Sequence, residues 1–534
     1  MITNKISDKH KRVIPLPKKA DFDGRFVKLD NSWLFDISKA CLTDEMGSKK
    51  KTGCKNNGIT NIVAKWAKKF GLSDTYCNSY SKLNIPCLKK IELYIETNLG
   101  KEEYKINLDN ELIKISAGSE KAIEYALQTL WQISPEGKFP TGVIEDKPSL
   151  KIRGFHINFD SFRQMDIEEA LNVMETAAEL KLNTILLEYG NRFPYEKHSR
   201  IAVNTTLKKE DIKRINDKAK ELGIDVIPLQ QTIGHLEYVL EHEYYKSLRE
   251  NNESISQICP LNPDSLTLIK ELLEEMIEAH PEIKYIHLGG DEARSLGKCP
   301  ACREKAEKLG VSRLYIDHMN LLCDFVISKG LTPIVWDDML CSHPEALDLL
   351  NKQIVIMYWD YWTVSKSSPY FIARYDRNGK PVTVCDIGWE KEWKHELTDL
   401  ERSIINTFAK KVSLRESLTE KFMDLYGPYL GSEFPKRIKG YPYLEFYQDK
   451  GFKVIGAPTS LGNGDDYNTL PNYWRFIPNI RTVAERCIEA GAEGMITTAW
   501  YNYHPVMFHM GIGATAQFAW GVNSESWGVC NDFK

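Results

Sequence analysis

The feature that most constrains the fold is a long alternation of strand-like and helix-like segments that begins at residue 151. Apolar runs of strand length recur, and several are separated by segments whose apolar residues have helical spacing. The expected strands cover residues 152–159, 183–188, 224–229, 285–288, 332–336, 354–359, 452–456 and 494–500. Eight strands alternating with helices predict an α/β protein, a TIM (β/α)8 barrel with its site at the carboxyl ends of the strands.

A doubly wound open sheet is the alternative for such an alternation. We disfavour it because no glycine-rich phosphate loop follows the first expected strand. Helices are expected at residues 166–178, 208–222, 264–280, 314–328 and 479–490. Asp166 with Glu169 resembles a capping box at the start of the first helix, and Gly491 is placed to end the last one.

The first 148 residues lack this alternation and predict a smaller N-terminal α+β accessory domain. Strands are expected at 13–17, 24–29, 91–96 and 103–108, and helices at 59–70 and 119–133. Pro140 to Pro148 contains Gly142 and is expected to be a linker. Residues 149–534 would then form the barrel domain, with a charged, helix-prone insertion at about 360–450.

Composition excludes several classes of partner. A net charge of −4 over 534 residues gives no reason to expect nucleic acid or an anionic membrane surface. The amino terminus has no apolar signal-peptide core, and no window approaches 18 consecutive apolar residues, so we expect a cytoplasmic protein without a membrane span. The 12 cysteines are mostly scattered singly, which favours buried thiols over a disulfide framework.

Two adjacent carboxylates, Asp291 and Glu292, follow the fourth expected strand and two glycines. Neighbouring residues of an extended chain point in different directions, so the two acids should have different surroundings. One carboxyl can then be protonated while the other stays charged. A solvated loop of acids is the duller interpretation of a bare Asp-Glu pair.

Aromatic and polar residues gather at the other strand ends. Trp336, Trp359 and Trp500 end three strands, next to further carboxylates, which suits an uncharged, ring-shaped, hydroxylated substrate. His235 follows the third strand and Arg153 lies in the first. The alternatives are core positions for the tryptophans, a hydrogen bond beneath the loop for His235 and a structural ion pair for Arg153.

A Cys-x-x-Cys motif, Cys299 to Cys302, comes soon after the acid pair. It is half of a zinc site, but no second Cys-x-x-Cys or closely spaced histidine pair accompanies it. Cys259 or Cys341 could complete a site only through folding. The sequence therefore favours ordinary thiols over zinc, and we expect neither a catalytic metal nor a cofactor.

The second domain resembles glycoside hydrolase family 20, the β-N-acetylhexosaminidases. The motif HLGGDE at residues 287–292 matches the family signature, and RGFHINF, IPLQQTIGH, VWDDM and TTAW support it. LEYGNRFPYEKH, CPLNP and YWDY are similar to the hexosaminidase D branch and its bacterial relatives. More weakly, IPLPKK and YALQTLWQISPEG in the first domain resemble the accessory domain that precedes many family barrels.

The resemblance implies substrate-assisted catalysis. Glu292 would protonate the glycosidic oxygen, and Asp291 would orient the 2-acetamido group, whose carbonyl oxygen closes an oxazolinium ring. Arg153 would bind ring hydroxyls and His235 would support the acid. The three tryptophans would enclose the sugar. We also expect the charge of Asp291 and the apolar wall to raise the pKa of Glu292.

Several positions depart from the family pattern. Asn158 and Asn191 stand where an aspartate is usual, so His235 could lack its carboxylate partner. No Tyr-x-Asp follows the seventh strand, and Tyr361, with Tyr467 as second choice, is our candidate for binding the acetamido oxygen. Asn502 replaces a glutamate of many relatives, which leaves GlcNAc and GalNAc both open.

The sequence thus predicts an exo-acting, retaining β-N-acetylhexosaminidase, with a glycan or glycoconjugate carrying a terminal N-acetylhexosamine as its partner. Two alternatives stay open. One is a binding protein that keeps the sugar pocket without turnover, favoured by the three asparagines. The other is a family enzyme that releases disaccharide units.

Overall fold

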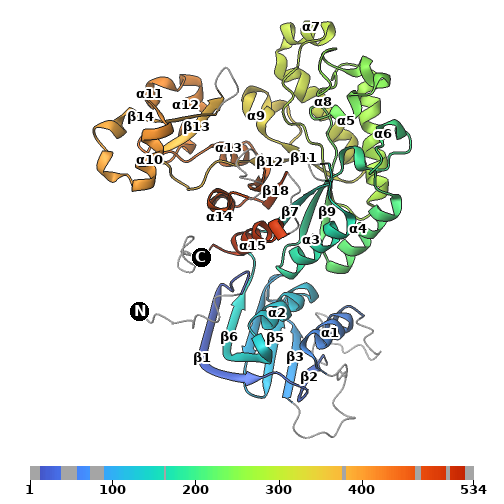
Figure 1. Cartoon of the computed structure of the whole chain (residues 1–534), viewed down its shortest axis with the longest axis vertical. Coiled ribbons are helices and arrows are strands. Elements are labelled where there is room, and N and C mark those ends of the chain that lie inside the picture. Colours follow the sequence, from blue (N-terminus) through green and yellow to red (C-terminus); the bar gives the residue numbers. More distant parts are fainter. Residues whose placement is uncertain are drawn as a thin grey trace. The chain divides into compact units, whose positions relative to one another are not determined.

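The computed structural model describes residues 13–37, 57–72, 89–160, 164–375, 381–462, 471–500 and 506–522. Tyr467, Asn502 and His504 lie outside these residues. The chain divides into two compact units (Figure 1). Unit 1 comprises residues 1–149, 179–181 and 519–534, and unit 2 comprises residues 150–178 and 182–518.

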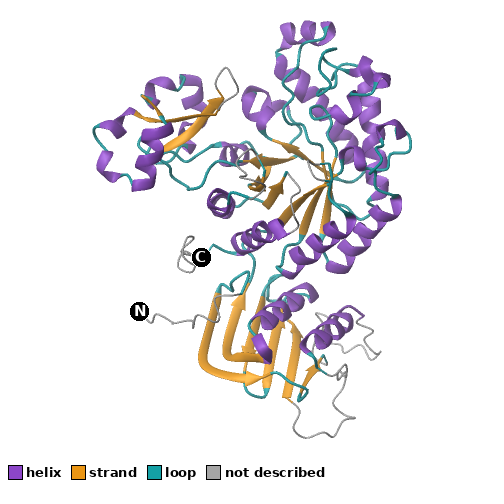
Figure 2. Ribbon diagram, viewed as in Figure 1, coloured by secondary structure: helices purple, strands orange, loops and turns teal. Residues whose placement is uncertain are grey.

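Unit 1 is built on a mixed, six-stranded sheet in the order β1-β6-β4-β5-β3-β2, counted over the described residues. Two helices pack against one of its faces (Figure 2). Its strands are β1 (Lys19–Lys28), β2 (Trp33–Asp36), β3 (Lys89–Ile95), β4 (Tyr104–Leu108), β5 (Leu112–Ala117) and β6 (Lys138–Asp146), and its helices are α1 (Asn57–Phe70) and α2 (Glu120–Gln132).

The expected linker at residues 140–148 is wrong for most of its length. Residues 140–146 belong to β6, which pairs with both β1 and β4. Gly142 has φ 147° and pairs with Phe22, the residue of β1 after which the register shifts. A glycine is therefore found here because β6 passes a bulge in β1. The expected strand at residues 13–17 also does not form, and β1 begins at Lys19.

Unit 2 contains the predicted barrel. Among the described residues, eight parallel strands close into a ring, because β16 pairs with β18 as well as with β12. The predicted TIM barrel with an N-terminal accessory domain is therefore confirmed. The barrel strands are β7 (Ile152–Asn158), β8 (Thr184–Glu188), β9 (Asp225–Leu229), β10 (Tyr285–His287), β11 (Thr332–Trp336), β12 (Val355–Trp359), β16 (Lys453–Ala457) and β18 (Gly494–Ala499), and β17 (Thr459–Leu461) pairs with β18.

The barrel interior is filled by side chains at alternate strand positions. Ile334 and Trp336 of β11 and Val355, Met357 and Trp359 of β12 belong to one apolar cluster. This period of two is what a pleated strand imposes, and it places the two tryptophans at the carboxyl ends of their strands. The aromatic residues are thus the upper layer of a packed core.

Helices surround the barrel (Figure 1). Gly491 ends α14 in a left-handed conformation, φ 65°, as predicted from the sequence. None of the helices in the described residues has the length and hydropathy needed to cross a membrane. They are α3 (Ile167–Glu179), α4 (Lys209–Leu222), α5 (Glu237–Leu240), α6 (Pro263–Ala279), α7 (Pro300–Leu309), α8 (Val311–Ser328), α9 (Asp338–Ser342), α13 (Tyr443–Asp449), α14 (Tyr473–Ala490) and α15 (Val506–Trp520).

The segment between β12 and α13 carries its own small sheet, in the order β13-β14-β15. Val384, Leu414, Leu430 and Ile438 form a core of its own. Its elements are β13 (Tyr370–Tyr375), β14 (Pro381–Asp386), β15 (Lys410–Val412), α10 (Asp399–Phe408), α11 (Leu414–Ser417) and α12 (Glu420–Tyr426).

Candidate active site

The acid pair follows the short strand β10. Gly289 at φ 61° and Gly290 at φ 93° turn the chain into Asp291. A Cβ atom at Gly289 would overlap Oε1 of Gln231, so this position accepts only glycine. The backbone N–H of Gly289 donates to Nδ1 of His287 at 2.9 Å. The strand end is therefore fixed by side chains that the glycines allow to approach.

His235 lies beside both acids. Its Nε2 is 3.3 Å from Oδ2 of Asp291 and 3.4 Å from Oε2 of Glu292. Hydrogen bonding to Asp291 first, and to Glu292 second, raises the pKa of His235 to about 11, so the imidazole is cationic at neutral pH. The sequence left open whether His235 has a carboxylate partner. In the structure its partners are Asp291 and Glu292.

Glu292 has a second cationic neighbour. Nη2 of Arg294 lies 2.5 Å from its Oε1. The hydrogen bond to His235 is the largest influence and, together with Arg294, it holds the pKa of Glu292 below its usual value, although burial acts the other way. The expected rise of this pKa is therefore wrong for the free protein. Glu292 also has φ 48°, a conformation uncommon outside glycine and frequent at functional sites.

Two further carboxylates follow β11. Oδ2 of Asp338 accepts the backbone N–H of Glu292 at 2.9 Å, which ties the acid to the neighbouring strand. Burial and the charge of Asp291 raise the pKa of Asp338 to about 7. Asp337 is buried, and burial raises its pKa as well. The loops after β10 and β11 thus bring four carboxyl groups together, and two of them, Asp291 and Glu292, contact the cationic His235.

The predicted aromatic wall forms. The ring centroids of Trp336 and Trp500 are 5.9 Å apart, those of Trp359 and Tyr361 are 5.0 Å apart, and those of Tyr361 and Trp500 are 6.4 Å apart. The negative charge of Asp291 contributes to the raised pKa of the buried Tyr361 hydroxyl, after the larger effect of burial. Asp291 is therefore close enough to the wall to act on the Tyr361 hydroxyl, and a common site for the wall and the acid pair stays a prediction.

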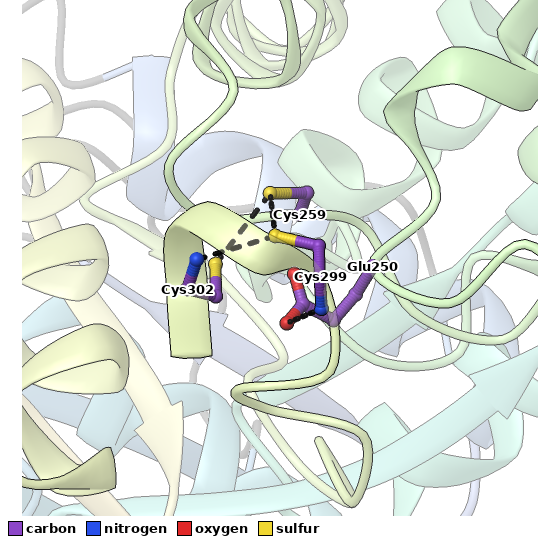
Figure 3. Close-up of side chains that lie close together, drawn as sticks. All are labelled: Glu250, Cys259, Cys299 and Cys302. Carbon is purple, nitrogen blue, oxygen red and sulfur yellow. Dashed lines mark hydrogen bonds between the residues drawn. The ribbon is translucent and has the colours of Figure 1, made fainter. Parts of the chain in front are cut away.

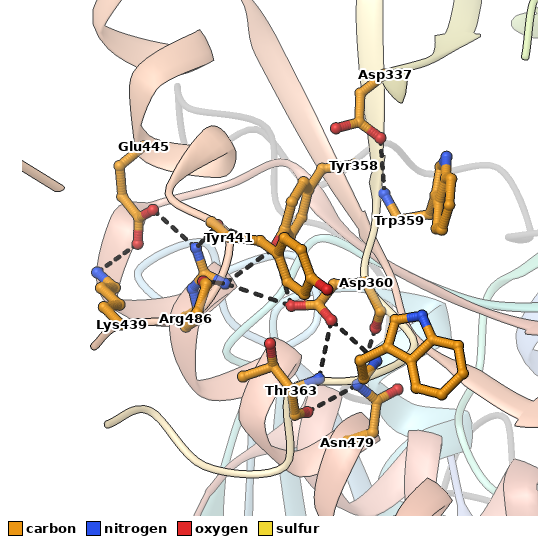
Figure 4. Close-up of polar contacts among 12 residues, drawn as sticks. Asp337, Tyr358, Trp359, Asp360, Thr363, Lys439, Tyr441, Glu445, Asn479 and Arg486 are labelled. Atoms are coloured by element: carbon orange, nitrogen blue, oxygen red, sulfur yellow. Dashed lines mark hydrogen bonds and ion pairs between the residues drawn. The ribbon is translucent and has the colours of Figure 1, made fainter. Parts of the chain in front are cut away.

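A buried polar network holds the loop that carries Trp359 and Tyr361 (Figure 4). Oδ1 of Asp337 accepts the backbone N–H of Trp359 at 3.0 Å. Oδ1 of Asp360 accepts the backbone N–H groups of Trp362 and Thr363 at 3.0 and 2.9 Å. These bonds fix the backbone on both sides of Tyr361.

Arg486 of α14 completes this network. Its Nη1 donates to the Tyr358 hydroxyl at 2.9 Å and lies 3.7 Å from Oδ2 of Asp360, and its Nη2 donates to Oε2 of Glu445 at 3.0 Å. The Nδ2 group of Asn479, also on α14, donates to the backbone oxygen of Asp360 at 2.8 Å. Helix α14 therefore holds the carboxyl end of β12 through contacts with Tyr358 and Asp360.

Arg153 is not part of this arrangement. It is the second residue of β7, near the amino end of the strand, and it is fully buried. Its Nη1 donates to the backbone oxygens of Leu150 and Lys151 at 2.9 and 3.3 Å. Both acceptors are backbone oxygens at the amino end of the strand, so these bonds are neither the expected contact with sugar hydroxyls nor the alternative ion pair.

A further polar group lies at the carboxyl ends of β7 and β8, and its histidine, His156, was not among the predicted site residues. Nε2 of His156 is 3.5 Å from Oε2 of Glu188, and Nε2 of Gln231 donates to Oε1 of Glu188 at 3.2 Å. The His156 ring also lies 5.0 Å from the Trp500 ring. A histidine inside an apolar strand is the signal that could have identified this group. No sequence signal pointed to Arg294, because its contact with Glu292 depends on the course of the loop.

Sequence comparison identifies the family. A sequence profile described as glycosyl hydrolase family 20, catalytic domain, matches residues 170–385, and one described as glycosyl hydrolase family 20, domain 2, matches residues 10–147. The chain belongs to glycosyl hydrolase family 20. The predicted family and the predicted enzyme class, glycoside hydrolase, are confirmed.

Two known proteins with similar sequences support the assignment to family 20. Hexosaminidase D of Bos taurus is 33% identical over 192 residues, covering 34% of this chain and 55% of that protein. A lacto-N-biosidase of Bifidobacterium bifidum is 25% identical over 276 residues, covering 49% of this chain and 24% of that protein. The matches thus span about half of the bovine protein and a quarter of the bacterial one.

The fold agrees as well. The crystal structure of a β-N-acetylhexosaminidase from Bacteroides fragilis NCTC 9343 superimposes with a TM-score of 0.62. The comparison covers 96% of this chain and 91% of that one, at 16% sequence identity. The family 20 chain therefore has the same fold as this hexosaminidase along nearly its whole length.

Proposed function

We propose that this family 20 chain is an exo-acting, retaining β-N-acetylhexosaminidase that releases terminal β-linked GlcNAc or GalNAc. The observation that carries the proposal is the acid pair Asp291–Glu292 beside a wall of Trp336, Trp359, Tyr361 and Trp500. An apolar aromatic wall suits the face of a sugar ring, and two carboxyls with different partners suit two chemical roles.

Glu292 is the proposed general acid. It donates its proton to the glycosidic oxygen while the carbonyl oxygen of the substrate's 2-acetamido group attacks the anomeric carbon. The bond to the leaving group breaks and an oxazolinium ring forms, so no protein nucleophile is needed. Intramolecular attack gains a high effective concentration. Glu292 then takes a proton from the water that opens the ring.

Asp291 is the proposed partner of the acetamido N–H and balances the positive charge of the ring. Tyr361 is our candidate for the acetamido oxygen, because its hydroxyl lies within the electrostatic influence of Asp291. His235 contacts both acids, and its positive charge offsets part of their negative charge. We do not include Arg153 among the sugar ligands.

Hydrolysis of nitrophenyl β-GlcNAc and nitrophenyl β-GalNAc tests the proposal. The wild-type chain should cleave at least one, and Glu292→Gln should lose ~10² to 10⁴-fold in kcat, the usual size for removing a general acid. A thiazoline mimic of the oxazolinium should inhibit. Cleavage of neither substrate, or full activity of Glu292→Gln, would contradict the proposal.

A disaccharide-releasing activity is the second candidate, and the similarity to the Bifidobacterium bifidum lacto-N-biosidase favours it. A β-linked nitrophenyl disaccharide, added to the same panel, separates the two. If the chain cleaves only this substrate, it is a biosidase. Binding of GlcNAc or GalNAc by calorimetry without any hydrolysis would instead support the sugar-binding alternative.

A further inference from the structure

Three cysteines and a glutamate meet where the loops beyond β9 and β10 reach the first turn of α7 (Figure 3). Within the described part of the chain, Glu250, Cys259, Cys299 and Cys302 offer four ligand atoms that all lie within 4.8 Å of one another. Sγ of Cys259 is 3.6 Å from Sγ of Cys299 and 3.6 Å from Sγ of Cys302. Folding therefore brings a third thiol and a carboxylate to the Cys-x-x-Cys motif.

The local structure explains why these residues meet. Glu250 and Cys259 flank an antiparallel bridge between Arg249 and Ile258, in which the N–H of Glu250 donates to the oxygen of Gln257 at 3.0 Å. Cys299 caps the amino end of α7, and its sulfur accepts the backbone N–H of Cys302 at 3.3 Å. Two turns of backbone thus present their side chains to one point.

One carboxylate oxygen of Glu250 is held by the backbone next to the thiols, and the other is buried. Oε1 of Glu250 accepts the backbone N–H groups of Lys298 and Cys299 at 2.8 and 3.2 Å. Oε2 is buried and accepts no hydrogen bond from the described residues. Glu250 as a whole is only 1% exposed. A buried carboxylate oxygen without a donor is costly, and a cation among the thiols would satisfy it.

The spacing fits a tetrahedral metal ion. With Zn–S bonds of about 2.3 Å, two thiolates on a tetrahedron stand roughly 3.8 Å apart, close to the 3.6 Å seen here. A disulfide would require about 2.05 Å. Three thiolates select soft or borderline ions, and the oxygen ligand favours zinc among them. Four protein ligands leave no open position, as in structural zinc sites.

We propose that Glu250, Cys259, Cys299 and Cys302 bind one Zn²⁺ ion. The ion joins the bridge at residues 249–258 to the start of α7 and so anchors the far end of the loop that begins at the acid pair. Cys299 follows Glu292 by seven positions, and the N–H of Ser295 between them donates to Oε1 of Gln257 at 2.7 Å. The zinc has a positioning role and does not touch the substrate. Its binding is independent of the proposed hydrolysis.

Metal analysis of the full chain, purified without a polyhistidine tag from zinc-supplemented cultures, tests the proposal. Mass spectrometry of the metals should find one zinc per chain in wild type. Cys299→Ser/Cys302→Ser should lose the zinc and Glu250→Gln should bind it more weakly under competition with a chelator. Cys341→Ser removes a thiol outside the cluster and should retain one zinc.

Cobalt substitution gives a readout of the ligands. Co²⁺ in the wild-type site should show thiolate-to-metal charge-transfer absorption and the visible bands of a tetrahedral ion, and both should be absent from the double serine variant. If that variant does not fold, the wild-type chain is treated with a chelator. Its melting temperature should then fall and be restored by Zn²⁺ but not by Mg²⁺.

Three results would overturn the proposal. One is a wild-type chain that contains no zinc and takes up none on dialysis against Zn²⁺. Another is full zinc content in the double serine variant. The third is a disulfide that joins Cys259 to Cys299 in the native protein, detected by mass spectrometry of alkylated peptides.

Discussion

At the scale of single residues, Glu292 is subject to opposing electrostatic effects. The proposed chemistry needs a proton on its carboxyl, whereas the cationic His235 and Arg294 favour the charged form. Burial favours the neutral form, and a sugar that fills the aromatic wall would remove further water. The acid therefore depends on substrate binding, or on mildly acidic conditions, to be protonated.

Replacing Arg294 by alanine should move the alkaline limb of the pH profile of kcat/KM to higher pH. That limb reports the pKa of the acid in the free enzyme, and Arg294 lowers this pKa. Without the guanidinium, Glu292 keeps its proton to higher pH, so activity persists where wild type has lost it. The measurement is kcat/KM for a nitrophenyl glycoside across the pH range.

Lys308→Ala is the control for this shift. Lys308 carries the same charge and pairs with Glu304 on the exposed face of α7, with a side chain 68% exposed. Its removal should leave the alkaline limb in place. A profile of Arg294→Ala that coincides with wild type, or that moves toward lower pH, would show that Arg294 does not control the protonation of Glu292.

At the scale of secondary structure, the elements that the sequence predicted well are those that bury apolar side chains on both faces. The barrel strands are short apolar runs, and their order along the chain fixes a parallel sheet. The site residues at the strand ends, Trp336, Trp359 and Asp291, followed from that order. The positions of the two tryptophans required only the period of two along each strand, whereas Asp291 follows the glycine turn after β10.

Elements that depend on partners far along the chain were not predictable in the same way. β6 contains Pro140 and Gly142, which are typical of a linker, yet it lies between β1 and β4 because a bulge in β1 accommodates it. The contact between Arg294 and Glu292 depends on how the loop turns after a left-handed residue. Cys259 joins Cys299 from a different loop, which no local spacing encodes.

Arg486 on α14 tests how much the site loop depends on a neighbouring element. Arg486→Met should destabilise the chain by about 3–5 kcal/mol, the usual cost of removing one partner of a buried ion pair. The guanidinium is fully buried, and its loss would remove the cation beside the buried Asp360, whereas Glu445 would keep its ion pair with Lys439. Urea unfolding followed by tryptophan fluorescence measures the change.

Arg481→Met on the same helix is the matched control. Arg481 pairs with Glu485 one turn away at 2.9 Å, and its side chain is 26% exposed. Its replacement should cost about 1 kcal/mol or less, because such pairs keep much of their hydration. Equal losses for the two variants would mean that the buried network adds no stability beyond an ordinary surface ion pair.

At the scale of the whole molecule, unit 1 is assembled from three separate segments of the chain. The strands of its sheet lie between Lys19 and Asp146, and residues 179–181 and 519–534 join it from beyond the start of unit 2. Lys181 and Trp520 lie in these later segments and are buried in unit 1. The accessory unit therefore cannot be completed until nearly the entire chain is present.

A buried polar cluster joins the three segments. Nζ of Lys181 donates to the hydroxyls of Tyr104 and Thr129 at 2.7 and 2.6 Å and lies 3.7 Å from Oδ2 of Asp146. Nε1 of Trp520 donates to Oδ1 of Asp146 at 2.8 Å. Asp146 thus contacts both of the added segments.

Asp146→Asn should therefore destabilise unit 1 by about 3–5 kcal/mol, because the ammonium of Lys181 would stay buried without this charge. Glu145→Gln is the matched control, since Glu145 is the adjacent residue of β6 and pairs with Lys19 and Lys105 at the surface. Its replacement should cost about 1 kcal/mol or less. Calorimetric unfolding of both full-length variants measures the difference. If Asp146→Asn melts at the same temperature as wild type, the charge of Asp146 contributes nothing to the assembly of the three segments.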